Sequence, residues 1–366
     1  MRVLHLVQKP QLRGAEIFTS QLSHHINQSG HKASIAFVFP GSGELPYQTS
    51  FFHLNGKSKR RFNDIQAWRR LAQIIKEEKP DIIQANAGDT LKYAVFSKLL
   101  FRWKQPIVFR NASTISLYIK KGLVKKWNGF FFKHAAKIIS VSNVSANDFA
   151  MVYPQYKHKI TTIPIGIESQ NSPEGSNSQL NPQSTYSYPT LAHVGGFTHE
   201  KNHTGLISIF EQLIQKHPSA KLHLVGDGPL RTKVEALVKE KNLQESVLFH
   251  GFQNNAMDYI RNADVLLLPS LIEGLPGVIL EAFFCRTPVV AYNVGGIKEV
   301  VIPEQTGYLV PKGDEQEFVI SVEKALHKGS KNSMIIDNAY QLVTSKYLNT
   351  QIAQEFLNVY TSVIAA

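Results

Sequence analysis

Short apolar runs alternate with helix-like stretches along most of this 366-residue chain, and this alternation limits the possible folds more than any other feature. In the first half, the segments between the runs have helical periodicity; the runs are RVLHLV, KASIAFVF, DIIQAN, PIVFRN, KIISVS and KITTIPIG. Such an alternation predicts a parallel sheet with helices on both faces. Two polar residues are suited to cap helices in this half, Asn63 before a long amphipathic stretch and Ser142 after KIISVS.

Residues 168–189 interrupt the alternation with a stretch rich in Ser, Asn, Gln and Pro, which we interpret as an interdomain linker. The alternation then starts again and continues to the C-terminal helices. A chain of this length usually contains more than one core. We therefore predict two doubly wound α/β domains that face each other across a cleft. The first spans residues 1–167 and the second 190–347, while residues 348–366 form a helix that can pack back on the first domain.

Positive charge is concentrated in the first half of the chain. Residues 1–165 contain 25 Lys and Arg against 8 Asp and Glu, whereas the remainder contains 15 basic and 20 acidic residues. This asymmetry indicates that the first half faces nucleic acid, an anionic membrane surface or an anionic substrate. No RNA- or DNA-binding module is visible, so nucleic acid is not among the expected partners.

The sequence also indicates a compartment. A single cysteine, Cys285, excludes an intrachain disulfide and fits a reducing environment. No apolar run reaches the roughly 18 residues that a membrane span requires, and the N-terminal MRVLHLVQKP is typical of a first strand rather than of a signal peptide. We expect a cytoplasmic protein.

The segment EGLPGVILE places two carboxylates, Glu273 and Glu281, eight residues apart. Pro276 is suited to the first turn of a helix, so Glu273 precedes the helix and Glu281 lies inside it. The free N–H groups of a helix N-terminus attract anions, so the acids are expected to surround a phosphate-sized anion site. The alternative is that Glu281 pairs with a lysine while Glu273 is a solvated loop residue. The residues expected at the anion site are Leu275, Pro276, Gly277, Val278 and Ile279.

A second candidate segment is HVGGFTHEKNH, in which a strand ends in Gly195 and Gly196 and Lys201 precedes a helix. A lysine there can pair with a diphosphate, although an ordinary loop lysine is the alternative. Gly226 belongs to another strand-end turn, VGDGP, which does not match a dinucleotide fingerprint. Phe252 is either a ring that contacts a base or a core residue. There is no D-x-D, no H-E-x-x-H and no cysteine cluster, so neither a metal nor another cofactor is expected.

The run EGLPGVILEAFFCRTPVVAYNVGGIKEVV, with VGGFTHEKN, VGDGP and GYLV, resembles the donor half of the family-four retaining glycosyltransferases of GT-B fold (glycosyl transferases group 1). RGAE, with Gly14, is similar to the glycine loop of their acceptor half. The resemblance implies two Rossmann-like domains and a UDP- or GDP-linked sugar as donor. It also implies that Glu281 holds the ribose, that Glu273 contacts the transferred sugar, and that Lys201 and Gly14 face the diphosphate. Glu273 and Lys201 are the expected catalytic residues.

The sequence departs from the family pattern at two positions. The family usually has an arginine where Gly196 stands, so one positive charge is missing or comes from elsewhere. The family often has a histidine at the end of the strand equivalent to PIVFRN, where this chain has Arg110 and Asn111. Arg110 is a candidate for the missing charge. Asn86 and Asp89, after another strand, are candidates for acceptor hydroxyls, or else they form a turn.

Residues 116–137 combine apolar and basic residues. On a helix, Ile119, Leu123, Trp127 and Phe130 fall on one stripe, with the lysines mostly off it. This pattern predicts either an interfacial membrane helix or a core-facing helix with a solvated basic face. We favour membrane contact because the charge asymmetry indicates the same partner.

These observations predict a retaining, metal-independent glycosyltransferase that acts at the inner face of the plasma membrane. Its acceptor would be a saccharide or a lipid-linked saccharide, as in polysaccharide or lipopolysaccharide synthesis. A sugar-nucleotide epimerase of the same fold would need acid and base residues at the sugar ring, and none is evident. A catalytically inactive sugar-nucleotide sensor is the other alternative, and Gly196 is its best support.

Overall fold

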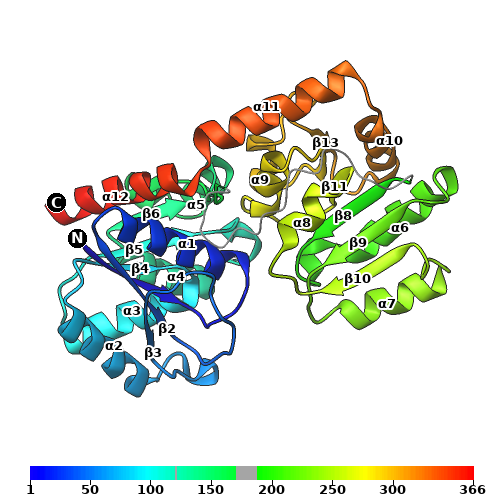
Figure 1. Ribbon diagram of the computed structural model, residues 1–366. Helices are drawn as coiled ribbons and strands as arrows, with labels where there is room; N and C mark the ends of the chain where they lie inside the picture. The colour runs from blue at the N-terminus through cyan, green and yellow to red at the C-terminus, as the bar shows by residue number, and fades with distance from the viewer. Residues whose placement is uncertain (120–121, 170–187) are drawn as a thin grey trace. The chain divides into compact units, whose positions relative to one another are not determined.

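The computed structural model describes residues 1–119, 122–169 and 188–366 (Figure 1). The chain divides into two compact units. The first contains residues 1–168 together with 348–366, and the second contains residues 169–347. Most of the linker expected at 168–189, namely residues 170–187, lies outside the described residues.

The first unit is built on a seven-stranded sheet with the order β3-β2-β1-β4-β5-β6-β7, in which all neighbours are parallel. The direction of winding reverses between β1 and β4, which is the topological switch point of the sheet. The strands are β1 (Arg2–Val7), β2 (Lys32–Phe37), β3 (Ser50–His53), β4 (Ile82–Ala85), β5 (Ile107–Asn111), β6 (Lys137–Ser140) and β7 (Ile160–Thr162).

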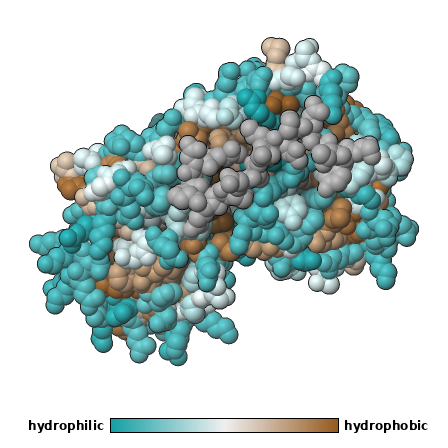
Figure 2. Space-filling model, in the orientation of Figure 1, coloured by the Kyte–Doolittle hydropathy of each residue, from teal (hydrophilic) through white to brown (hydrophobic). Residues whose placement is uncertain are grey.

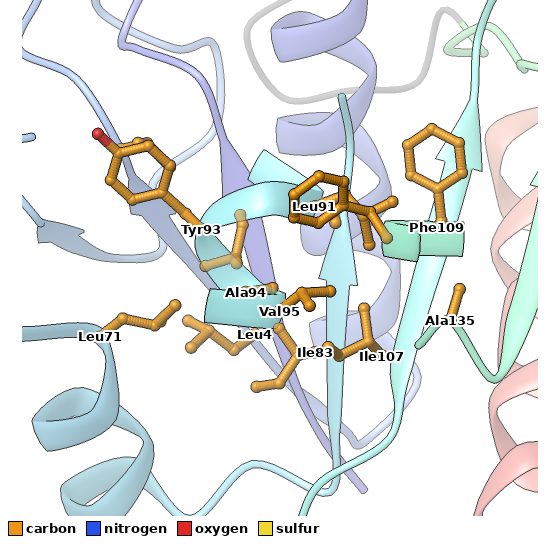
Figure 3. Packing of buried hydrophobic residues seen from close by; sticks show 14 of the residues in the cluster. Leu4, Leu71, Ile83, Leu91, Tyr93, Ala94, Val95, Ile107, Phe109 and Ala135 are labelled. Atoms are coloured by element: carbon orange, nitrogen blue, oxygen red, sulfur yellow. The ribbon is translucent and has the colours of Figure 1, made fainter. Parts of the chain in front are cut away.

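Both faces of this sheet are covered by helices because consecutive strand residues point to opposite faces. Ile83 belongs to the core beneath α2, α3 and α4, whereas Ile82 belongs to the core beneath α1 and α12. Figure 3 shows Leu71 of α2 and Leu91 of α3 directed toward the first of these cores. The helices are α1 (Gly14–Gln28), α2 (Ile65–Glu78), α3 (Gly88–Phe101), α4 (Leu123–Lys133), α5 (Asn143–Val152) and α12 (Asn349–Ala365).

The C-terminal helix α12 therefore completes the core of the first unit. Phe356 packs against Phe18 of α1, with ring centroids 6.0 Å apart. The hydroxyl of Tyr360 donates a hydrogen bond to Gln84 of β4. At the start of α12, Asn349 Nδ2 donates to Glu168 Oε1 at 2.7 Å.

The second unit has a six-stranded parallel sheet with the order β10-β9-β8-β11-β12-β13. Its switch point lies between β8 and β11. The strands are β8 (Thr190–Val194), β9 (Lys221–Val225), β10 (Val247–Gly251), β11 (Val265–Leu268), β12 (Val289–Tyr292) and β13 (Tyr308–Val310). The helices are α6 (His203–Lys216), α7 (Arg231–Glu240), α8 (Ala256–Arg261), α9 (Gly277–Phe284), α10 (Glu315–Leu326) and α11 (Ser330–Lys346).

Short 3₁₀ helices connect several of these elements: η1 (Ser58–Arg60), η2 (Ile115–Leu117), η3 (Pro154–Lys159), η4 (His199–Lys201) and η5 (Gly295–Glu299). Among the described residues, no helix combines the length and the apolar character needed to cross a bilayer. The two parallel sheets with helices between their strands confirm the predicted fold class.

Several local predictions were wrong. Asp64, not Asn63, caps α2, and its side chain accepts a hydrogen bond from the Ala67 N–H. The helix predicted within 116–137 is only α4, because Gly122 has a φ of 87° and starts the helix as its N-cap. Pro276 is the N-cap of α9 rather than a residue of its first turn. The cap predicted at Ser142 is confirmed, since its side chain accepts from the Ser145 N–H.

Candidate active site

The second unit gathers its polar loops at the carboxyl ends of β8 and β11. Open α/β sheets bind ligands at this edge, next to the switch point. The loop after β8 contains the two predicted glycines Gly195 and Gly196 and ends at Lys201. The loop after β11 contains Glu273 and leads into α9.

Three hydrogen bonds connect these two loops. Lys201 Nζ donates to Glu273 Oε1 at 2.6 Å and forms an ion pair with it. The Leu271 N–H donates to the Glu200 carbonyl at 2.7 Å, and Asn202 Nδ2 donates to the Pro269 carbonyl at 3.0 Å. The structure therefore brings the two expected catalytic residues into direct contact. Glu273 is not the solvated loop residue of the alternative interpretation.

The N-terminus of α9 offers fewer free donors than we predicted. The Ile279 N–H already donates to the Pro276 carbonyl at 3.3 Å. Within the described chain, no backbone hydrogen bond uses the N–H groups of Gly277 and Val278. Leu275 and Pro276 are buried beside them. Two N–H donors and the positive end of the helix dipole thus remain for an anion.

Glu281 lies in the second turn of α9 and is half-buried. No hydrogen bond or ion pair of its carboxyl group is found among the residues that the structure describes, so the alternative pairing with a lysine is not observed. Burial raises the pKa of Glu281 to about 7. A carboxyl group that has no hydrogen-bond partner and lies beside a helix N-terminus is free to accept hydrogen bonds from the hydroxyl groups of a ligand.

A glycine that we did not predict shapes the Glu273 loop. Gly295 has a φ of 55°, and a Cβ on it would lie 1.9 Å from the Glu273 carbonyl oxygen. The neighbouring Gly296 N–H donates to the Gly274 carbonyl at 2.6 Å. The two glycines after β12 therefore fix the backbone position of Glu273 and Gly274, Gly295 by close packing and Gly296 by a hydrogen bond. The signal in the sequence was the GG of VGGIKE, read only as part of the family resemblance.

The predicted glycines after β8 and β9 differ in how much room they have for a side chain. A Cβ on Gly226, which has a φ of 138°, would meet the Gly195 carbonyl oxygen at 2.1 Å, so the two loops touch through backbone. A Cβ on Gly196 would be 3.5 Å from the Asp227 carbonyl oxygen, an ordinary contact. The space beside Gly196 thus admits the first atom of a side chain. Phe252 is 46% exposed, so the core interpretation of this ring is wrong.

The predicted residues of the first unit lie near the carboxyl edge of its own sheet, and most are engaged within the protein. Asn86 Oδ1 accepts from Gln84 Nε2 at 2.9 Å, and its Nδ2 donates to the Leu6 carbonyl at 3.2 Å. Asp89 forms ion pairs with Lys92 and Arg61. Asn111 Nδ2 donates to Ser140 Oγ at 3.3 Å. Gly14 begins α1, and a Cβ there would meet nothing within 4 Å.

Arg110 is the exception, because its charge has little compensation. The residue is 3% exposed, and within the described chain its Nε and Nη1 have no hydrogen-bond partner. The guanidinium lies over the Phe18 ring, 4.4 Å from its centroid. Burial lowers the pKa of Arg110 to about 10, so the group stays charged at neutral pH. Its neighbour Glu16 is buried as well, which raises the pKa of that carboxyl group.

Two family models match the chain, one in each half. Residues 12–171 match "Glycosyltransferase Family 4", and residues 181–342 match "Glycosyl transferases group 1". An uncharacterised glycosyltransferase of Methanocaldococcus jannaschii is 27% identical over 269 residues, which are 68% of this chain and 66% of that protein. The N-acetyl-alpha-D-glucosaminyl L-malate synthase of Bacillus anthracis is 30% identical over 48% of this chain and 45% of its own length. The matches thus span from under half to about two thirds of these relatives.

The fold has close counterparts among solved structures. The Anabaena protein HepE, solved in complex with UDP and glucose, superimposes with a TM-score of 0.80 at 19% identity, covering 99% of this chain and 100% of that one. At this identity the likeness concerns the fold, which is GT-B. Together with the two family models, it leads to one conclusion: the chain belongs to the glycosyltransferases of group 1 and family 4.

Proposed function

We propose that this protein is a retaining glycosyltransferase that moves a sugar from a nucleotide-diphosphate sugar to a saccharide or lipid-linked acceptor. The donor carries UDP or GDP; UDP is favoured because the similar HepE protein binds UDP. The reaction requires no metal and serves cell-surface polysaccharide or lipopolysaccharide synthesis on the cytoplasmic side of the membrane. Residues 1–167 bind the acceptor and residues 190–347 the donor.

The observation that carries this proposal is the grouping of a cation, two free backbone N–H donors and two acids at one sheet edge. Lys201 and the start of α9 stabilise the negative charge that develops on the departing diphosphate. Glu281 accepts hydrogen bonds from the ribose hydroxyls, and the exposed ring of Phe252 contacts the base. Glu273, held by Lys201 and by the glycines at 295 and 296, faces the transferred sugar.

The chemical step proceeds on one face of the sugar. The bond between the anomeric carbon and the diphosphate oxygen breaks, and its electron pair stays with the diphosphate. The acceptor hydroxyl forms the new bond on the same face and gives its proton to the departing phosphate oxygen. Glu273 is ion-paired rather than poised as a nucleophile, which favours this route over a covalent glycosyl intermediate.

The rival functions predict different behaviour at this site. A same-fold epimerase needs an acid and a base at the sugar ring, and Glu273 is already paired with Lys201. A catalytically inactive sensor keeps binding without turnover, and Gly196 supports it because the family arginine is missing. Arg110 can supply that charge only from the first unit, where it is buried.

Contact with an anionic membrane surface forms part of the same proposal. The exposed positions of α4 include Leu123, at 84%, and Trp127 and Phe130, as expected of an interfacial helix. The same helix also faces the core, through Phe131 and Phe132. Lys125 and Lys126 belong to the same helix. Lys120 and Lys121, which we also expected to contact lipid, lie outside the described residues.

A thermal-shift titration with UDP and GDP tests donor binding. A ligand present at 100 times its dissociation constant stabilises the folded state by about 2.7 kcal/mol. We expect one of the two nucleotides to raise the melting temperature of the wild type and to do so much less in Lys201→Ala. Lys239→Ala, an exposed lysine of the same unit, is the matched control and should respond like the wild type. The absence of any shift with either nucleotide would refute the donor assignment.

A further inference from the structure

A groove of about 650 Å³ lies on the first unit between α2 and the chain that follows α3. It is formed by α2, from Arg69 onward, and by residues 101–105, and none of the candidate-site residues described above lines it. Its walls are basic and apolar, and no acidic residue lines it. The lining residues are Arg69, Ala72, Gln73, Ile75, Lys76, Lys79, Phe101, Trp103, Lys104 and Gln105.

The four cations of the groove are free to bind an anion. Within the described residues, none of Arg69, Lys76, Lys79 and Lys104 forms an ion pair, and all four are exposed. Of the two acids at the end of α2, Glu78 forms an ion pair with Lys32 at 2.8 Å, and Glu77 accepts a hydrogen bond from the lining residue Gln73 at 2.8 Å. Cations that line a concavity and are not ion-paired are typical of a site for a phosphate group.

Two apolar residues at the end of α3 directly precede Phe101, which lines the groove. Leu99 and Leu100 are 47% and 50% exposed at the end of this helix. Trp103 follows them and is half-buried: its ring packs against the core, and its Nε1 donates to Ser97 Oγ at 3.1 Å. Lys98 Nζ lies 5.3 Å from the centroid of this ring. Lys98 also donates to the carbonyl of Gln105 at 2.7 Å, which fixes the course of the chain beside the groove. A basic cavity next to two exposed leucines matches a lipid–water interface.

The apolar surface continues along α3, through the half-buried Phe96, to the exposed aromatic residues Trp127 and Phe62. Residues four apart on a helix share a face, so Phe96 lies one turn from Leu100. Phe96 and Trp127 have ring centroids 6.3 Å apart, and Trp127 in turn lies 5.9 Å from Phe62. We call this surface, made by Phe62, Phe96, Leu99, Leu100 and Trp127, the α3 face. Figure 2 shows hydrophobic surface among hydrophilic residues where Figure 1 draws α3.

A simpler explanation accounts for only part of the groove. Lysines near a helix C-terminus interact favourably with the helix dipole, and this explains Lys76 and Lys79 at the end of α2. It does not explain Arg69 or Lys104, nor the two adjacent exposed leucines at the end of α3. A nucleic acid is a poorer match at the groove itself, because the exposed apolar side chains next to it are leucines, whereas bases stack on aromatic rings.

We propose that the groove between α2 and α3 binds the phosphate of an anionic lipid headgroup while Leu99 and Leu100 enter the bilayer interface. This inference rests on the proposed membrane location of the enzyme and names the surface that provides it. The α3 face and α4 then lie on the same side of the first unit as the bound lipid.

Partitioning into vesicles of phosphatidylcholine and phosphatidylglycerol tests the proposal with the full-length protein. The groove variant is Lys76→Ser/Lys79→Ser/Lys104→Ser. A control of equal charge is Lys239→Ser/Lys312→Ser/Lys328→Ser, three exposed lysines of the second unit. With about 1 kcal/mol for each cation near such a surface, we expect the groove variant to bind on the order of 100-fold more weakly. The control should lose far less.

Two further comparisons separate the sources of binding. Leu99→Ser/Leu100→Ser keeps every charge and should still weaken partitioning, which purely electrostatic attraction would not predict. All variants should keep the wild-type melting temperature and its shift with nucleotide, so a failure of donor binding is seen separately from a failure of lipid binding. The proposal is overturned if the groove variant partitions like the control. It is equally overturned if only Lys125→Ser/Lys126→Ser of α4 abolishes binding, or if the groove cations bind inorganic phosphate or RNA but no vesicles.

Discussion

Glu281 is a carboxyl group that burial has made difficult to ionise, because no cation or donor of the described chain compensates its charge. Its pKa of about 7 stands against an ordinary value of 4.5. A ribose would supply two hydroxyl donors and favour the charged form. The ionised group thus destabilises the free protein and stabilises the complex, as expected of a binding residue rather than of a structural one.

The stability of the free protein should reveal this cost. Because the folded-state pKa is raised, the contribution of Glu281 to stability is complete below pH 4.5 and is lost as the pH rises through 7. Glu281→Gln removes the titration, so we expect it to be more stable than the wild type at pH 8, by up to about 3 kcal/mol. Near pH 4.5 the difference should almost vanish.

Denaturant unfolding at both pH values measures this effect. Glu240→Gln, an exposed glutamate of α7, is a suitable control and should show no such pH dependence. A Glu281→Gln protein that is less stable than the wild type at pH 8 would mean that the carboxylate has a compensating partner, contrary to our description of the site.

At the scale of elements, the loops around Glu273 depend on backbone contact rather than on side chains. Gly295→Ala introduces a Cβ that collides with the Glu273 carbonyl and occupies a left-handed conformation. Strain of this kind costs about 1–3 kcal/mol. We expect the substitution to displace the Glu273 loop and to reduce sugar transfer at least tenfold, while the rest of the unit stays folded.

Gly196→Ala is the matched comparison, since its Cβ meets only an ordinary contact. It should retain nearly normal melting and nucleotide affinity. Steady-state kinetics and thermal melting of the two variants distinguish the effects. If both glycine variants had the same activity and melting temperature, the close approach of Gly295 to Glu273 would not be needed for function.

The elements also show what could be predicted from the sequence. Every strand of the two sheets except β3 was predicted, because each of the others is a short, continuous apolar run between helical stretches. Strand β3 was missed because its SFFH is short and half-exposed at the sheet edge. Helix α4 was predicted too long because the positive φ of Gly122 is a feature of the folded backbone that hydrophobic periodicity does not report.

The candidate site was predictable to the extent that its parts are local in sequence. Glu273, Glu281 and the start of α9 fall within nine residues, so their proximity follows from one helix. The ion pair of Glu273 with Lys201 joins residues 72 positions apart, and the contact with Gly295 joins a third loop. Only the order of strands in the sheet brings these loops together, and the sequence alone did not specify that order.

At the scale of the whole molecule, each unit has its own sheet, core and set of polar loops. The first unit is discontinuous in sequence, because α12 supplies Phe356 and Tyr360 to its core. It also carries the basic groove and the α3 face, whereas the second carries the paired acids and Lys201. The uneven distribution of charge along the chain therefore corresponds to two surfaces with different proposed partners, a lipid surface and a nucleotide sugar.

The central claim is that the second unit binds a nucleotide sugar in order to cleave it. The most direct measurement is the release of free nucleotide diphosphate from UDP- and GDP-sugars by the wild type and by Glu273→Gln. We predict slow hydrolysis of one donor by the wild type, even without acceptor. In Glu273→Gln the turnover should fall at least tenfold while the affinity for the free nucleotide stays nearly unchanged, because this residue is proposed to contact the sugar and not the nucleotide. A wild-type protein that binds the nucleotide tightly yet releases none from any donor, with or without saccharide acceptors, would contradict the account and identify a sensor.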